Sequence, residues 1–252
     1  AAYMRQRVEA LNELGIEGRL TEQMVAGWEA DPPAPDADAE FVACMEEILD
    51  TYEEPYDSDF PVVCMDEQPV QLIKEICQPL PATPGRAACV DYEYERNGTA
   101  NVFMFTEPLG GWRRTSIREH KTALDWAEEI RHLLESDYPD APTVTLVCDN
   151  LNTHKIASLY QAFPPEIARG LVERLDIHFT PKHGSWLNIA ENELSVLTRQ
   201  CLDRRIPDLD SLTRETQAWH TQRNASAKTV DWQFTTDDAR IRAAVPTIQY
   251  LL

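Results

Sequence analysis

Two apolar runs that each end in a carboxylate constrain the fold of this chain most strongly. The run 60–65 is followed by Asp66 and Glu67, and the run 144–148 is followed directly by Asp149. Runs of this kind, with few polar interruptions, are typical of buried central strands. We therefore expect an α/β protein in which two strands carry Asp66 and Asp149. If the two strands are neighbours in the sheet, the two acids lie side by side.

The remaining periodicities predict the elements around these strands. A turn at 107–110 separates two further strands, which predicts an antiparallel hairpin. Apolar residues recur at helical spacing over 186–202, so Glu191 should lie on an amphipathic helix. The order of elements predicts a ribonuclease-H-like α/β fold, with a mixed central sheet of three antiparallel strands followed by parallel strands, flanked by helices. The expected elements besides the two apolar runs are strands at 99–106, 111–117 and 176–180, and helices at 38–52, 121–136, 155–174 (interrupted at Pro164 and Pro165), 186–202 and about 209–222.

The negative charge of the chain is concentrated near its N-terminus. The formal net charge is −20, and residues 1–60 alone hold sixteen acids and three bases. Such an excess argues against a protein whose whole surface grips nucleic acid. We expect short helices within 4–30, broken at Gly15 and Gly18, followed by a linker rich in proline and aspartate at 31–36. The predicted division is an acidic N-terminal segment at 1–37 and a ribonuclease-H-like domain at 38–252.

The sequence also indicates where the protein works. It has no run of about 18 apolar residues, and its first residues lack the order of a secretory signal, so we expect a soluble cytoplasmic protein and no membrane partner. The six cysteines include no C-x-x-C pair and no histidine at zinc-finger spacing, which argues against a zinc finger. Cys64 and Cys148 lie inside the apolar runs and should be buried.

Asp66, Asp149 and Glu191 are the candidate catalytic residues and metal ligands. Hard cations such as Mg²⁺ prefer oxygen ligands, and phosphoryl transfer on nucleic acid commonly uses two such ions. Both aspartates follow long apolar runs, where an unpaired carboxylate is costly without a cation. The alternative is that these acids end their strands by chance, because the chain contains 43 acids.

Four ordered blocks carry a more specific resemblance. They read PVVCMDE at 61–67, RNGTAN at 96–101, DNLNTH at 149–154 and PKHGSWLNIAE at 181–191. Over about 39 to 240 the chain resembles insertion-sequence transposases of the 630 branch, which belong to the mariner superfamily of DDE endonucleases. The resemblance implies a catalytic domain that cleaves DNA and transfers the freed strand, with Asp66, Asp149 and Glu191 holding Mg²⁺ or Mn²⁺ as a pair of ions.

The same resemblance implies partners. Double-stranded DNA is expected, both as transposon ends and as target, together with a homodimer on that DNA. Transposases of this kind place a helix-turn-helix before the catalytic domain, and the acidic residues at 1–37 contain no basic recognition helix. We therefore expect a separate helix-turn-helix polypeptide or a missing N-terminal domain. The alternatives are a stand-alone ribonuclease-H-like nuclease and an inactive transposase remnant that only binds DNA or a partner.

Basic and aromatic residues near the expected triad are candidate DNA contacts, and each has a structural alternative. Lys182 and His183 lie on a turn that would suit the DNA backbone or be simply solvated. Trp186 is a packing anchor or a base-stacking platform, and the arginines after 111 are phosphate contacts or ordinary surface pairs. The candidate DNA contacts are Lys182, His183, Trp186, Arg113, Arg114 and His154, and the residues expected to orient the triad are Asn188 and Asn150.

Overall fold

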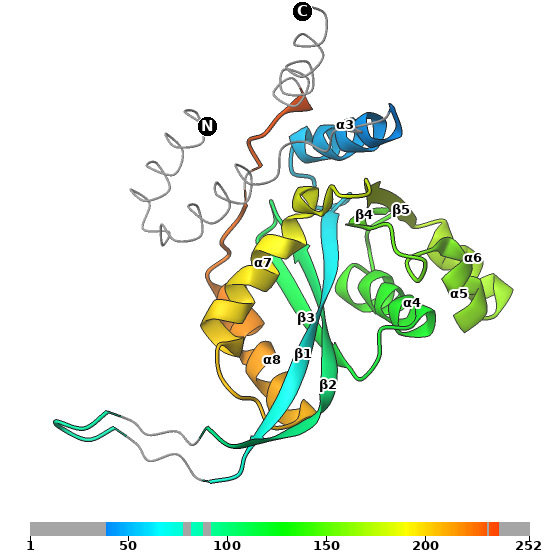
Figure 1. Ribbon diagram of the computed structural model, residues 1–252. Helices are drawn as coiled ribbons and strands as arrows, with labels where there is room; N and C mark the ends of the chain where they lie inside the picture. Colours follow the sequence, from blue (N-terminus) through cyan, green and yellow to red (C-terminus); the bar gives the residue numbers. More distant parts are fainter. Residues whose placement is uncertain (1–38, 78–81, 88–91, 231, 237–252) are drawn as a thin grey trace, which may run out of the picture.

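A single five-stranded sheet forms the centre of the protein (Figure 1). The computed structural model describes residues 39–77, 82–87, 92–230 and 232–236, so the helices and linker expected within 1–37 lie outside the described residues. The boundary near residue 37 stays a prediction. The strands are β1 (Val62–Glu75), β2 (Tyr94–Glu107), β3 (Trp112–Arg118), β4 (Val144–Asp149) and β5 (Leu175–Thr180).

The strand order β3-β2-β1-β4-β5 confirms the predicted mixed sheet. The first three strands in sequence pair antiparallel, β1 with β2 and β2 with β3. β4 joins the other edge of β1 in parallel, and β5 joins β4 in parallel. The two apolar runs therefore form neighbouring strands, and parallel strands buried on both sides are where continuous apolar sequence is expected.

Helices cover both faces of the sheet (Figure 1). On one face, α4, α5 and α6 pack over a core that contains Trp126 and Leu159. On the other face, α3, α7 and α8 pack over a core that contains Ile48, Leu194 and Trp219. The main helices are α3 (Ala39–Glu53), α4 (Ala123–His132), α5 (Ile156–Ala162), α6 (Pro165–Val172), α7 (Ile189–Leu197) and α8 (Leu209–Ala225).

Alternation along β1 assigns its side chains to the two faces. Val63 and Met65 belong to the core beneath α4, whereas Cys64 belongs to the core beneath α7. Successive side chains of a strand point to opposite faces, so Asp66 points toward the α7 face and Glu67 toward the α4 face. Cys64 and Cys148 are fully buried, as predicted.

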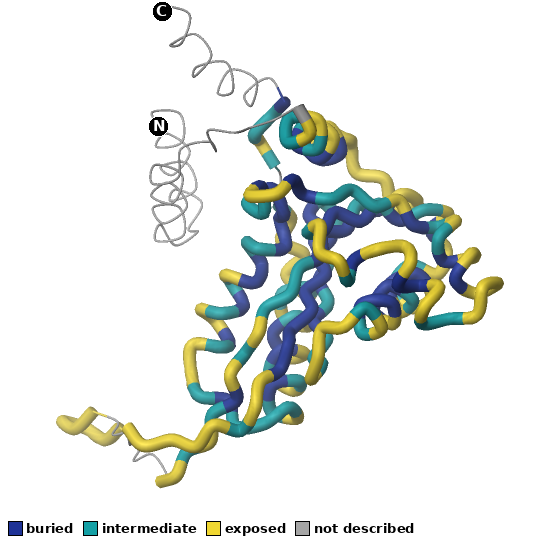
Figure 2. Tube along the Cα trace, turned by 45° about the vertical axis from the view of Figure 1, so that its right-hand side comes forward, coloured by how far each residue is buried: buried dark blue, intermediate teal, exposed yellow. Residues whose placement is uncertain are grey.

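β1 and β2 continue beyond the part of the sheet that β4 joins, as an arm formed by 68–75 and 94–99, which the sequence did not predict. Each strand has 14 residues, and the arm mixes exposed side chains, shown in yellow in Figure 2, with partly buried ones, while Leu72 belongs to the core beneath α7. The predicted strand ends at Glu67, whereas the observed strand continues through Pro69. Beyond Met65, however, β1 has lost β4 as a neighbour and pairs with β2 alone. A proline is tolerated where one edge of the strand is unpaired.

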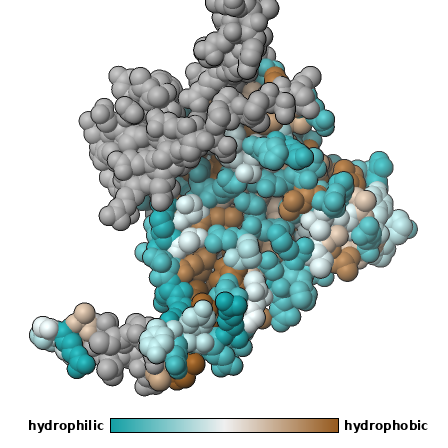
Figure 3. Space-filling model, in the orientation of Figure 1, coloured by the Kyte–Doolittle hydropathy of each residue, from teal (hydrophilic) through white to brown (hydrophobic). Residues whose placement is uncertain are grey.

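The helix predicted over 186–202 is divided into three pieces. A 3-10 turn, η2 (Ser185–Leu187), precedes α7, and a π-helical turn, η3 (Thr198–Leu202), follows it. The break occurs at Asn188, which has an extended backbone and caps α7 through its side chain. The face in Figure 3 is largely hydrophilic, with separate apolar patches. Among the described residues, every helix is too short or too polar to cross a bilayer.

Candidate active site

The pairing of β1 with β4 brings Asp66 and Asp149 together. Met65 and Cys148 form the last pair of the parallel ladder, so the next residue on each strand is an aspartate. Both aspartates lie on the α7 face, because Cys64 and Val147, two residues earlier on each strand, belong to the core under α7. The sequence therefore folds so that two carboxylates leave neighbouring strands at the same level and on the same face.

Glu191 reaches this place through the N-terminus of α7. The preceding Asn188 is buried, and its Nδ2 donates a hydrogen bond to the Met65 carbonyl oxygen (2.8 Å). Its Oδ1 accepts a hydrogen bond from Ala190 N (3.1 Å). One side chain thus caps the helix and ties its first turn to β1 at the residue before Asp66. Glu191, in that first turn, is held over the same end of the sheet.

The three carboxylates influence one another electrostatically. Burial, with the charges of Asp149 and Glu191, raises the pKa of Asp66 to about 7. Burial, with the charge of Asp149, also raises the pKa of Glu191, against a hydrogen bond from Ser185 that lowers it. In the described parts of the chain, no lysine, arginine or histidine forms an ion pair with any of the three. The site is a concentration of negative charge without a compensating cation.

Asp149 is fixed by its neighbours at the strand end. Thr180, the last residue of β5, donates its hydroxyl to Asp149 Oδ1 (2.9 Å). The Asp149 carbonyl oxygen accepts the Leu151 N–H (2.8 Å) and faces His154 Nδ1 at 2.9 Å. One carboxylate oxygen is therefore anchored, and the other has no hydrogen-bond donor among the described residues.

The donor set suits a hard divalent cation. Three carboxylates supply oxygen ligands, and a cation would relieve the repulsion that raises the pKa of Asp66. As they stand, no three histidine, cysteine, aspartate or glutamate side chains of the described residues converge closely enough to hold one ion. Ligation by all three therefore requires a change of rotamer, and Glu191 has the longest side chain with which to make it.

Glu67 and His154 form a buried pair on the opposite face of β1, which the sequence interpretation missed. Glu67 Oε1 lies 2.8 Å from His154 Nε2, and both side chains are almost inaccessible. Because the Asp149 carbonyl oxygen only accepts, His154 Nδ1 must carry a hydrogen toward it, so a second proton has to lie between Nε2 and Glu67. Side chains alternate between the two faces along β1, so Glu67 points toward the core under α4. This alternation is the sequence feature that indicates its burial.

Two predicted DNA contacts are wrong because their side chains are buried. Arg113 is 1% exposed and donates from Nη2 to Glu193 Oε1 (3.0 Å) on α7 and to the Lys228 carbonyl oxygen (2.6 Å). His154 is also 1% exposed, stacked on Trp126 and bonded to Glu67. Both residues hold elements of the fold together, and neither side chain presents a surface that DNA could touch.

The other predicted contacts differ in how accessible they are. Lys182 and His183 are exposed on the turn between β5 and η2, beside the start of α7. Arg114 is largely covered, bonded to Glu129 and Asp137 on the α4 face. Trp186 is partly buried and packs edge-on against Phe234, so it anchors this corner as the structural alternative expected. Asn150 is exposed directly after Asp149.

Comparison with known proteins identifies the family. A family model described as DDE superfamily endonuclease matches residues 61–213, which is more than half of the chain and includes Asp66, Asp149 and Glu191. No curated protein sequence matches the chain significantly. Solved structures of the mariner transposase Mos1 are among those that it resembles.

These similarities are at the level of the fold. The Mos1 mariner paired-end complex with Mg is 14% identical, with 80% of this chain and 59% of that chain covered and a TM-score of 0.50. The paired-end complex with Mn is 12% identical, with 84% and 65% covered and a TM-score of 0.49. The catalytic domain of Mos1 mariner transposase is 11% identical, with 72% and 79% covered and a TM-score of 0.48. The chain thus spans less than two thirds of the two complexed proteins.

The arrangement of strands and helices confirms the predicted ribonuclease-H-like fold, and the predicted family relationship is confirmed by the match over 61–213. The three carboxylates lie inside the matched region, on β1, at the end of β4 and on α7. The chain belongs to the DDE superfamily endonuclease family.

Proposed function

We propose that this chain is the catalytic domain of a DNA transposase, which hydrolyses a phosphodiester at a transposon end and then joins the freed 3′-oxygen to a target phosphate, with the 3′-oxygen of the target strand as the leaving group. The observation that carries the proposal is the group of three mutually repelling carboxylates, Asp66, Asp149 and Glu191, which no cationic side chain of the described residues compensates. In a DDE endonuclease, such a group is suited to divalent ions.

Asp66, Asp149 and Glu191 are the residues proposed to hold Mg²⁺ or Mn²⁺, as two ions. When bound, such ions neutralise charge on the attacking and leaving oxygens of a phosphodiester. Mos1 mariner complexes with Mn and with Mg support this choice of cations. The ligand chemistry supports it independently, because carboxylate oxygens are what these cations prefer.

The side chains around the triad contribute position and proton transfer. Thr180 keeps one Asp149 oxygen fixed, and Asn188 keeps the first turn of α7 against β1. These contacts hold two carboxylates on rigid elements, as positioning for in-line displacement requires. Glu191 lies at the same end of the sheet, so its carboxylate is also the candidate to accept the proton of the attacking water or hydroxyl.

DNA is the proposed partner, although the chain is strongly acidic. Lys182 and His183 are exposed at the turn that leads to α7, and they are the proposed backbone contacts. The paired-end complexes of Mos1 support transposon ends as the substrate. A homodimer on DNA, and a helix-turn-helix supplied by a separate polypeptide or an N-terminal domain, complete the proposal.

The test uses DNA that carries the inverted repeats flanking the gene, with Mn²⁺ and a target plasmid. We expect cleavage at the repeat end and joining of the 3′-end to the plasmid. Glu191→Gln should lose both activities, whereas Glu173→Gln, at an exposed residue directly after α6, should keep them. Cleavage without joining would identify a stand-alone nuclease instead, and absence of both activities with every supplied helix-turn-helix partner would contradict the proposal.

A further inference from the structure

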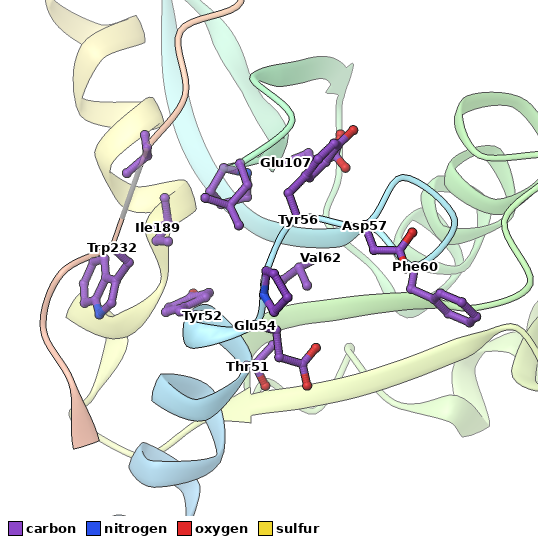
Figure 4. Close-up of a pocket in the computed structure, with 14 residues that line it drawn as sticks. Thr51, Tyr52, Glu54, Tyr56, Asp57, Phe60, Val62, Glu107, Ile189 and Trp232 are labelled. Atoms are coloured by element: carbon purple, nitrogen blue, oxygen red, sulfur yellow. The ribbon is translucent and has the colours of Figure 1, made fainter. Parts of the chain in front are cut away.

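A cavity of about 430 Å³ opens at the end of the sheet where β1 begins and β2 ends (Figure 4). The last turn of α3 and the loop after it form one side, and Ile189 of α7 and Trp232 form the other. None of the three candidate metal ligands lines this cavity. It is therefore a feature of the molecule that the proposed DNA chemistry does not use.

Aromatic side chains form much of the cavity wall. Tyr52 and Trp232 pack against each other with ring centroids 5.4 Å apart, tilted by 51°. Tyr56 and Phe60, on the loop after α3, are 55% and 53% exposed. Large aromatic side chains left exposed beside a cavity are typical of protein interaction sites. The electron-rich faces of tyrosine and tryptophan also attract cations.

Among the described residues, the charged side chains that line the cavity are all acidic: Glu54, Asp57 and Glu107. Glu107 is only 6% exposed. Its Oε2 accepts a hydrogen bond from the Tyr138 hydroxyl (3.2 Å), while no described residue donates to Oε1. Gly110 leaves room for this carboxylate, because a Cβ at that position would collide with it. The charge of Glu107 raises the pKa of Tyr56, so the two groups lie near each other, and they overlap at one corner of the cavity in Figure 4.

We propose that this cavity binds the guanidinium or ammonium group of a basic segment of a partner polypeptide. A cationic donor supplies what Glu107 lacks, since a buried carboxylate is stabilised by charge-assisted hydrogen bonds. Glu54 and Asp57 at the cavity oppose an anionic ligand, and a purely apolar one would leave Glu107 uncompensated. The exposed Tyr56 and Phe60 provide contact area for the backbone and neighbouring side chains of the segment. The inference does not depend on DNA cleavage.

The experiment follows the tryptophan indole N–H resonances of the full chain by NMR during peptide titration. The probes are three capped pentapeptides that are identical except for a central arginine, lysine or citrulline, the last being the neutral analogue of arginine. The Trp232 indole reports on the cavity, and those of Trp126 and Trp219, which do not line it, are internal references. Trp232→Phe assigns the reporting resonance.

We expect the arginine and lysine peptides to shift the Trp232 resonance saturably and the citrulline peptide to leave it in place. Glu107→Gln keeps the volume and the acceptor for Tyr138, and it should weaken binding of the arginine peptide by about tenfold, the usual effect of losing one charge-assisted hydrogen bond. Glu173→Gln, at an exposed residue directly after α6 that does not line the cavity, removes the same charge and should leave the affinity unchanged.

Three results would overturn the proposal: equal shifts with the citrulline peptide, equal shifts of all indoles, or an affinity that Glu107→Gln and Glu173→Gln alter alike. If Glu107→Gln does not fold, the double variant Glu54→Gln/Asp57→Asn decides, because both changed residues are exposed. It should weaken the arginine peptide by about threefold, as expected for two partly screened charges, and unchanged affinity would equally contradict the proposal.

Discussion

Two glutamates of α7, two residues apart, have opposite surroundings. Glu193 is buried and is bound by two arginines, Arg113 from β3 (Nη2 to Oε1, 3.0 Å) and Arg223 from α8 (Nη2 to Oε1, 2.9 Å). Glu191 has no cationic partner among the described residues, and its pKa is raised by burial and by Asp149. The same helix therefore carries one acid whose charge is compensated by arginines and one whose charge no described side chain compensates.

On the other face of the sheet, Glu129 is likewise a buried acid that arginines compensate. Glu129 of α4 is buried, yet its pKa is lowered, because Arg114, Ser116 and Arg118 compensate the cost of burial. Asp66, on the neighbouring part of the sheet, has a pKa raised to about 7. Glu193 and Glu129 are buried acids that arginines compensate, whereas Asp66, Asp149 and Glu191, which we assign to metal, have no arginine partner among the described residues.

The largest expected effect is on DNA cleavage, which substitution of Glu191 should abolish and substitution of Glu193 should not. Glu191→Gln removes a proposed metal ligand and should reduce DNA cleavage by about 1000-fold or more, as loss of a principal electrostatic element does. Its free energy of unfolding should stay the same or increase. Glu193→Gln should retain cleavage at low temperature and lose stability instead. Initial cleavage rates and urea unfolding of both variants make the comparison, and equal loss of cleavage in the two would break it.

Among the residues that bind Glu193, Arg113 should be the one whose substitution by methionine destabilises the protein most. Arg113→Met leaves Glu193 with one arginine and removes hydrogen bonds to the carbonyl oxygens of Gly111 and Lys228. Breaking a buried ion pair by removing one partner typically costs about 3–5 kcal/mol. Urea denaturation at neutral pH measures the loss. Arg169→Met, which removes an exposed pair on α6, is the control and should cost less than about 1 kcal/mol.

Asp66 should make the metal-free protein less stable as pH rises. Its pKa is about 7 in the folded state and 3.8 without the fold, so the folded state holds the proton more tightly. The penalty therefore develops between about pH 4 and 7 and is fully present above that range, at about 2–4 kcal/mol. Asp66→Asn should be more stable than the wild type at pH 8 by about 2 kcal/mol and similar at pH 4. A difference independent of pH would contradict the shift.

Breaking the hydrogen bond between Glu67 and His154 should lower the free energy of unfolding by a smaller amount. His154→Phe keeps the stacking on Trp126 but loses the hydrogen bonds to Glu67 and to the Asp149 carbonyl oxygen. We expect a loss of about 1–3 kcal/mol, since a buried acceptor is left unsatisfied. The double variant Glu67→Leu/His154→Phe should recover part of the loss in urea denaturation. No recovery would show that the two side chains are not coupled.

Local periodicity was enough to predict much of the architecture. The apolar runs before Asp66 and Asp149 led to the two central strands, and helical spacing led to the helix of Glu191, because these features lie within a few residues of one another. The break at Asn188 was also readable, since an asparagine before Ile189 is a common helix cap. It was overlooked because the apolar spacing continues through it.

The errors concern contacts between distant parts of the chain. Arg113 was expected on the surface, and its partner Glu193 lies 80 residues away. The bond between Glu67 and His154 joins residues 87 positions apart. Whether a charged side chain points inward depends on such partners, and local sequence does not contain them. The arm of β1 and β2 was not predicted for a related reason, because its residues follow the end of the apolar run and the two strands pair there only with each other.

The most direct test of the metal assignment is Mn²⁺ binding to the protein without DNA, measured by the EPR signal of the free ion. The wild type should bind Mn²⁺, and Asp66→Asn, Asp149→Asn and Glu191→Gln should each weaken binding by about tenfold or more, since each removes one of few protein ligands. Glu193→Gln, folded as judged by circular dichroism, should bind like the wild type. Equal binding by Glu191→Gln and the wild type would contradict the central claim that Asp66, Asp149 and Glu191, which have no arginine partner among the described residues, are the metal ligands.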